Sequence, residues 1–163
     1  MPETIDQRLA ELKIELPAAA QPVGNYVPFV VTGKLVQVSG QIPAWNGEVR
    51  HVGRLGEGLA VADGYAAARL CALNLLAQLR VACGGDLGRV RRVVRLGGFV
   101  NSAPTFNDAP KCVNGASDLM VEVFGKEIGS HARFAVGVAA LPAGVAVEVD
   151  GTFEIAGAAR SKP

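Results

Sequence analysis

The sequence predicts an α+β protein in which two helices cover one face of a mixed β-sheet. Small and aliphatic residues recur every three or four positions from Leu59 to Ala77, which is the period of an amphipathic helix. Valine-rich segments typical of strands lie before this helix, after it and near the C-terminus. Half of the 163 residues are hydrophobic but only 6% are aromatic, so we expect a core of Ala, Val and Leu.

The elements are expected in the order β-β-α-β-α-β-β after an N-terminal helix. Thr4 and Gln7 have the spacing of a capping box for that helix, which ends before Pro17. Asn46-Gly47 is a turn signal, and Gly84-Gly85 ends the long helix. The expected elements are strands over 26–32 and 34–39, a helix over 58–83, a strand over 89–100, a loop over 101–110, a helix over 111–124 and a hairpin over 132–155.

The chain is expected to form one domain over residues 17–156, with a helical extension over 1–16 and a flexible tail over 157–163. Helices on one sheet face leave the other face uncovered, and a small domain can cover such a face by oligomerising. The valines expected to supply this interface are Val36, Val38, Val136, Val138, Val145, Val147 and Val149.

One charged residue stands in each strand of the expected C-terminal hairpin, Arg133 in the first and Glu148 in the second. An unpaired charge is costly inside an apolar strand, so these charges indicate a partner chain, solvent or a substrate. A two-residue turn at Pro142-Ala143 would pair Arg133 with Thr152 and place both charges on the same sheet face, about 13 Å apart. That separation is too large for one small ligand, which predicts a site completed across subunits.

Composition and charge exclude several classes of protein. The formal net charge of +1 gives no global attraction for nucleic acid, and no aromatic residue interleaves the arginines of 89–95 to stack bases. The sequence has no apolar run that could span a membrane and no secretory signal, so a cytoplasmic location is expected. Cys71, Cys83 and Cys112 lack metal-ligand or disulfide spacing and are expected to be reduced core residues. No metal or other cofactor is expected.

Three motifs, in order, resemble the RidA/YjgF family, also called L-PSP endoribonuclease-like proteins. Val38-Ser39-Gly40-Gln41-Ile42-Pro43 is similar to its Ser-Gly-Gln-Ile-Pro signature, and Gly24-Asn25-Tyr26 to its Gly-x-Tyr. The Ala-Arg strand at Arg133, the Leu-Pro turn and the Val-Glu-Val strand at Glu148 resemble its C-terminal signature. The resemblance covers roughly residues 20 to 156.

The resemblance implies a chorismate-mutase-like fold, a homotrimer whose three sheets form a barrel, and ligand sites between subunits. It implies hydrolysis of reactive enamines and imines, such as 2-aminoacrylate, to a 2-keto acid and ammonia without a cofactor. Arg133 would hold the substrate carboxylate and Glu148 would orient the attacking water. The substrate-binding residues would be Tyr26, Ser39, Gly40 and Asn114.

Some positions depart from the family pattern, which indicates a divergent branch. His131 and Asn25 replace prolines, Ala135 replaces a common cysteine, and the loop over 101–108 is long.

Other interpretations of the function stay open. The chain could be a non-catalytic trimer that binds a small carboxylate, or, less in keeping with its charge, an endoribonuclease or translation inhibitor. An Arg133–Glu148 ion pair could also serve only to lock the trimer.

Further structural interpretations stay open for single residues. Tyr26 could be a half-buried strand residue, and Asn114 could bond only the local backbone. Ser39 and Gly40 could simply end a strand, and His131 could line the pocket.

Overall fold

The computed structural model describes residues 2–157, which form three helices and nine strands, with a five-stranded sheet and two helices as the two main layers. The predicted tail over 157–163 lies, apart from Gly157, outside the described residues. The elements are α1 (Ile5–Glu11), β1 (Phe29–Thr32), β2 (Leu35–Gln41), β3 (Ala44–Trp45), β4 (Glu48–Val49), β5 (Arg54–Leu55), β6 (Gly58–Leu59), α2 (Val61–Ala82), the 3₁₀ turn η1 (Leu87–Arg89), β7 (Val90–Asn101), α3 (Ala109–Gly129), β8 (Ala132–Val138), the 3₁₀ turn η2 (Pro142–Gly144) and β9 (Val147–Ile155).

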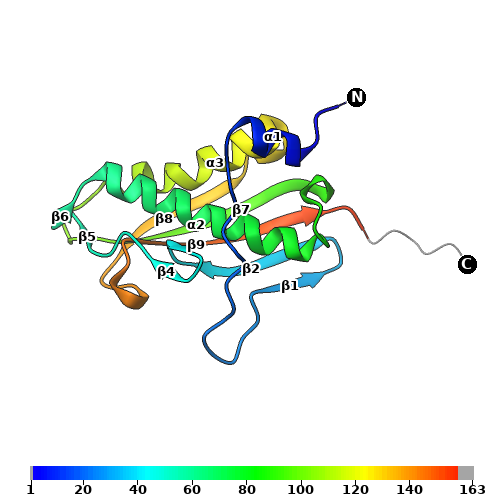
Figure 1. Ribbon diagram of the computed structural model, residues 1–163. Helices are drawn as coiled ribbons and strands as arrows, with labels where there is room; N and C mark the ends of the chain where they lie inside the picture. Colours follow the sequence, from blue (N-terminus) through cyan, green and yellow to red (C-terminus); the bar gives the residue numbers. More distant parts are fainter. Residues whose placement is uncertain (1, 158–163) are drawn as a thin grey trace, which may run out of the picture.

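The main sheet has five strands in the order β1-β2-β9-β7-β8, and only β7 and β8 run parallel. α2 and α3 lie side by side on one face of this sheet, and the other face carries no helix (Figure 1). The predicted α+β class, mixed sheet and two covering helices are therefore confirmed. The capping box is present as predicted, with the Thr4 hydroxyl accepting from the Gln7 N–H.

The predicted C-terminal hairpin is wrong. β8 pairs in parallel with β7, and β9 lies on the other side of β7, between β7 and β2. α3 forms the crossover that a parallel β7–β8 pair requires, so β8 cannot also be the antiparallel partner of β9. Two apolar segments around a Pro-Ala-Gly turn resemble a hairpin locally, and only the position of β7 shows that they are not paired.

This topology also overturns the prediction that Arg133 and Glu148 share a sheet face. Arg133 lies beside Leu96, whose side chain is fully buried under the helices. Glu148 lies opposite Phe99, three residues further along β7. Because side chains alternate along a strand, Arg133 faces α3 and Glu148 faces the uncovered side of the sheet.

The core consists mainly of small aliphatic side chains between the sheet and α2 and α3, as the composition predicts. Five of the seven valines assigned to an interface lie instead in this core: Val36, Val38, Val145, Val147 and Val149. They occupy helix-facing positions or the closely packed turn before β9, so helices or loops already cover them. Val30, Leu35 and Val136 are the large aliphatic residues exposed on the uncovered face.

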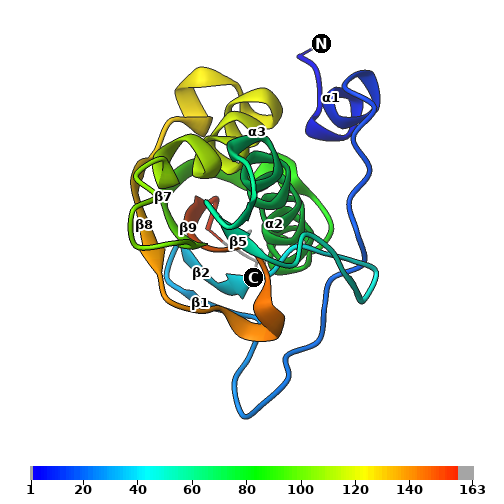
Figure 2. The ribbon, with the colours of Figure 1, turned by 90° about the vertical axis from the view of Figure 1, so that its left-hand side faces the viewer.

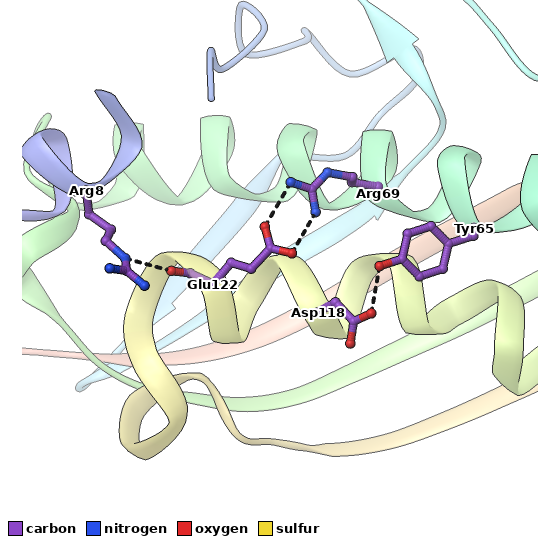
Figure 3. Close-up of polar contacts among 5 residues, drawn as sticks. All are labelled: Arg8, Tyr65, Arg69, Asp118 and Glu122. Carbon is purple, nitrogen blue, oxygen red and sulfur yellow. Dashed lines mark hydrogen bonds and ion pairs between the residues drawn. The ribbon is translucent and has the colours of Figure 1, made fainter. Parts of the chain in front are cut away.

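The extension is docked on the domain through α1, which lies against the C-terminal half of α3 (Figure 1). Figure 3 shows the polar contacts that α3 makes with α1 and α2. Arg8 Nε donates to the Glu122 carbonyl at 3.0 Å, while Arg69 of α2 binds the Glu122 carboxylate at 2.9 and 3.3 Å. Tyr65 donates to Asp118 at 2.6 Å, and this hydrogen bond raises the pKa of Tyr65.

Close approach of α2 and α3 depends on Gly115. A Cβ at this position would collide with the Tyr65 carbonyl oxygen, which belongs to the rigid backbone of α2. Glycine ordinarily weakens a helix, but α3 needs Gly115 for its packing against α2. α3 continues to Gly129 rather than to Phe124, although Gly125 interrupts it with a φ of +78°.

We expect Gly115→Ala to lower the free energy of unfolding by about 2 kcal/mol, because overpacking outweighs the better helix propensity of alanine. Urea denaturation measures this change. The control Glu127→Ala, at an exposed position of the same helix, should alter stability by less than about 0.5 kcal/mol. Equal stability of Gly115→Ala and wild type would contradict the close helix contact.

Candidate functional site

The structure brings the predicted site residues together in two separate groups. Arg133 and Asn114 belong to an arginine cluster between β8 and α3, which also contains Ser117 and His131. Tyr26, Ser39, Gly40 and Glu148 line one cavity, here called the glutamate pocket. No residue of the first group lines the second, so the described residues of one chain do not bring Arg133 to Glu148.

Arg133 is held by α3 in the arginine cluster. Its Nη1 donates to Asn114 Oδ1 at 2.8 Å and to Ser117 Oγ at 3.1 Å, and its Nη2 donates to the Pro110 carbonyl at 3.4 Å. Arg133 reaches these groups because it faces the helix side of β8, while Asn114 and Ser117 lie one turn apart on α3. Asn114 thus bonds a distant side chain rather than only the local backbone.

His131 lies two residues before Arg133 and bonds the same serine. Its Nε2 is 2.9 Å from Ser117 Oγ, and its Nδ1 is 2.7 Å from the Gly129 carbonyl oxygen. Burial lowers the pKa of His131, and the charge of Arg133 acts in the same direction. Ser117 is a site residue that the sequence did not predict, although its position three residues after Asn114 places both on one helix face.

The glutamate pocket is a cavity of about 770 Å³. Asn74 and Gln78 of α2 line it together with Glu148 of β9, and residues of η2 close one side. Tyr26 precedes β1 instead of lying within it, lines the cavity and is 54% exposed as a residue. The alternative interpretation of Tyr26 is therefore wrong about the strand, although the residue is about half-buried.

A break in the β2–β9 ladder forms the wall of the pocket beside Glu148. The pairing shifts between Val38 and Gln41, so Ser39 and Gly40 leave the regular register. A Cβ on Gly40 would lie only 3.1 Å from the Glu148 carboxyl carbon, and glycine therefore lets this carboxyl group lie against the backbone. The Ser39 hydroxyl donates to the Val27 carbonyl at 2.8 Å, which ties the segment after Tyr26 to the strand.

Glu148 is a candidate proton acceptor because its surroundings disfavour ionisation. Burial raises the pKa of Glu148, and the neighbouring charge of Asp150 raises it further. A carboxylate with a raised pKa is a stronger base than an ordinary surface glutamate. Its neighbours Val147 and Val149 are fully buried on the opposite face, so the backbone of Glu148 is firmly placed.

The connection between α1 and β1 forms a roof over the glutamate pocket, which the sequence did not predict. Figure 2 shows this connection passing α2 before it loops back to β1. Residues 18–23 line the cavity. The Ala18 N–H donates to Asn46 Oδ1 at 2.8 Å, and Gln78 Nε2 donates to the Ala20 carbonyl at 2.6 Å.

The three cysteines are core residues, and the described part of the chain contains neither a cluster of metal ligands nor a membrane-spanning helix. Cys71, Cys83 and Cys112 are buried free thiols, and burial raises the pKa of each, that of Cys112 to about 11. Within residues 2–157 no three His, Cys, Asp or Glu side chains are grouped closely enough to hold a metal ion. In the same residues no helix has the length and apolar character needed to span a membrane.

Comparison with known proteins identifies the family. The family model described as "YjgF/chorismate mutase-like, putative endoribonuclease" matches residues 6–149. Protein TCP17 of Trypanosoma cruzi is 52% identical over 147 residues, covering 90% of this chain and 91% of that protein. A crystal structure from Shewanella oneidensis is 38% identical with a TM-score of 0.89, covering 94% of this chain and 100% of the other.

A more distant match is E. coli TdcF, solved with bound serine. It is 26% identical with a TM-score of 0.59, covering 86% of this chain and 94% of that one. From the extent of the family match and the identity to TCP17, this chain belongs to the YjgF/chorismate-mutase-like family. The resemblance to RidA/YjgF proteins found in the sequence is thus confirmed.

Glu148→Gln should stabilise the folded protein at neutral pH. The pKa of Glu148 is raised above its ordinary value of 4.5, so wild type loses stability as the pH rises from 4.5 through the folded-state pKa. Glutamine does not ionise, and the advantage of the variant should therefore shrink as the pH falls back toward 4.5. Urea unfolding over this pH range measures the difference.

The matched control is Glu127→Gln, which alters an exposed carboxylate of α3. Its stability difference from wild type should stay within about 0.5 kcal/mol throughout. A Glu148→Gln variant that is less stable than wild type at neutral pH would mean that the carboxylate is stabilised by a partner in the fold.

Proposed function

We propose that this protein hydrolyses small reactive imines or enamines that carry a carboxylate, of the 2-aminoacrylate type, to a 2-keto acid and ammonia. The reaction would take place between copies of the chain in a homotrimer. One observation carries this proposal. Arg133, held by hydrogen bonds to α3, and Glu148, whose pKa is raised by burial, stand on opposite faces of one sheet, each among its own group of neighbours.

Arg133 and Glu148 each have a role in the reaction. Arg133 is a planar cation that suits a substrate carboxylate, because its N–H groups can pair with both oxygens. An enamine such as 2-aminoacrylate first tautomerises to the imine, and the protonated imine reacts. Glu148 accepts a proton from water as the water oxygen bonds to the imine carbon and the C=N electron pair moves to nitrogen, which gives a neutral carbinolamine. Glu148 returns this proton to nitrogen and then accepts the hydroxyl proton as the C=O bond forms and the C–N bond breaks, so that the keto acid and ammonia leave.

The relatives agree with a small substrate. TdcF was solved with bound serine, a small molecule that carries a carboxylate. In this chain the glutamate pocket has about 770 Å³ and combines Glu148 with polar groups such as Asn74 and Gln78. A pocket of this size can admit a small amino-acid-like molecule, with room left over for a bulkier side chain.

Binding of a small carboxylate without catalysis is the second candidate, since Arg133 and Asn114 serve it equally well. An endoribonuclease is less well supported because the arginines of β7 have partners in the chain. Arg95 lies 4.8 Å from the Phe134 ring centroid and 3.5 Å from Asp150. Arg92 donates to the Glu127 carbonyl.

Substitutions of the two charged residues should separate binding from catalysis. With 2-aminoacrylate generated in situ, Arg133→Ala should raise KM about 100-fold, because a charge-assisted bidentate contact is lost. Glu148→Gln should lower kcat by about 100-fold or more, the usual contribution of a general base. Calorimetry with pyruvate, the stable product, should show weaker binding for Arg133→Ala and near-normal binding for Glu148→Gln.

These measurements also distinguish the two candidate functions. Wild type that binds pyruvate through Arg133 but does not accelerate hydrolysis of any in situ imine would support the binding function. Hydrolysis that is unchanged in Glu148→Gln would contradict the assigned role of Glu148. Glu127→Gln serves as the control for loss of an exposed carboxylate elsewhere.

Mixed oligomers test whether the site is shared between chains. Arg133→Ala and Glu148→Gln should each retain about one hundredth or less of the wild-type kcat/KM, but co-expression at equal levels should leave about one quarter of the interfaces with both functional residues. About a quarter of wild-type activity should therefore return. The double variant co-expressed with wild type provides the control, and no recovery in the mixed single variants would contradict a shared site.

A further inference from the structure

We propose that Ser117 and His131 are positioning residues that hold Arg133 with its Nε and Nη2 edge available to a carboxylate. This inference rests on the proposed carboxylate-binding role of Arg133. Ser117 and His131 do not contact the ligand in this proposal. They act through the guanidinium, and together with Asn114 they complete a chain of hydrogen bonds behind it.

The direction of each hydrogen bond in the cluster follows from chemistry. The Gly129 carbonyl can only accept, so His131 Nδ1, at 2.7 Å, must carry a proton. In neutral histidine the other nitrogen then accepts, and Ser117 Oγ at 2.9 Å must donate to His131 Nε2. Burial lowers the pKa of His131, which agrees with a neutral ring.

Because the Ser117 hydroxyl donates to His131, the lone pairs of its oxygen remain free to accept a hydrogen bond from Arg133. The guanidinium has no acceptor, so Nη1 must donate to Ser117 Oγ at 3.1 Å. If the serine hydroxyl were free to rotate, its proton could instead point toward Arg133 or compete for Asn114 Oδ1. By accepting the Ser117 proton, His131 prevents these other orientations of the hydroxyl group and so fixes the position of Arg133 Nη1.

The hydrogen bonds of Arg133 show which edge remains for a ligand. Nη1 has two hydrogens, and both are used by Asn114 and Ser117. Nη2 makes one long bond of 3.4 Å to the Pro110 carbonyl, and Nε has no hydrogen-bond partner among the described residues. A carboxylate can therefore bind in a bidentate manner to Nε–H and the second Nη2–H, without breaking the bonds of Nη1.

Positioning of this kind should affect affinity more than turnover. Arginine side chains have many rotamers, and ordering one on binding costs free energy that a preformed cluster avoids. Loss of Ser117 or of the accepting nitrogen of His131 should weaken substrate and product binding together. Glu148 lies in the glutamate pocket and not in the arginine cluster. The proton transfer that it performs, and therefore kcat, should change little.

Two substitutions of His131 provide a matched test. Gln can place its carbonyl oxygen near the position of Nε2 and accept from Ser117, whereas the shorter Asn reaches only as far as Nδ1. With 2-aminoacrylate generated in situ, Ser117→Ala and His131→Asn should raise KM about 10-fold with little change in kcat, which is the effect of one lost hydrogen bond to a charged group. His131→Gln and Ser117→Thr should recover most of the loss.

Two controls and a binding measurement accompany the kinetics. His51→Asn makes the same change at a histidine outside the cluster, and thermal unfolding checks that each variant folds. Calorimetry with pyruvate should show the same order of affinities as the KM values. Equal behaviour of His131→Asn and His131→Gln, or a loss of kcat at constant KM, would overturn the positioning role.

The proton order can be measured without activity. Nitrogen-15 NMR of the His131 ring should show the tautomer protonated at Nδ1 at neutral pH, and a ring protonated at Nε2 overturns the proposal. If wild type binds pyruvate but hydrolyses no imine, the proposed reaction is ruled out. The positioning role is then tested by the pyruvate affinities of the Ser117 and His131 variants. Wild type that does not bind pyruvate overturns both.

Discussion

The position of β9 between β2 and β7 determines on which side of the sheet each functional group lies. Parallel pairing of β7 and β8 turns Arg133 toward α3, where Asn114 and Ser117 bind it. Antiparallel pairing of β9 with β7 turns Glu148 the other way, beside the break in β2. A direct β8–β9 pair would have left both charges on one face, and the division of the site into two clusters would be lost.

Much of the local structure could be predicted from the sequence because it depends on short-range chemistry. The Thr4–Gln7 capping box, the Asn46-Gly47 turn and the helix ending near Gly84 involve residues a few positions apart. Strand pairing is a long-range property, and two valine-rich segments do not specify whether a third strand lies between them. The hairpin, and with it the shared face of Arg133 and Glu148, was wrong for this reason.

The candidate site could be predicted in composition but not in arrangement. The motifs identified six residues, and the structure groups four in the glutamate pocket and two in the arginine cluster. Ser117 was missed because a serine inside a helix has no distinctive sequence signal. His131 was noticed as a departure, but its role depends on the Gly129 carbonyl and Ser117, which only the fold brings to its ring.

The roof over the glutamate pocket has a consequence for how this protein could diversify. Residues 18–23 lie outside the helices and strands, and their described side-chain bonds come from Asn46 and Gln78 rather than from the core. Insertions or replacements there can change the volume above Glu148 while leaving the sheet and both helices intact. The range of accepted molecules can therefore change through one loop, independently of the residues that perform the chemistry.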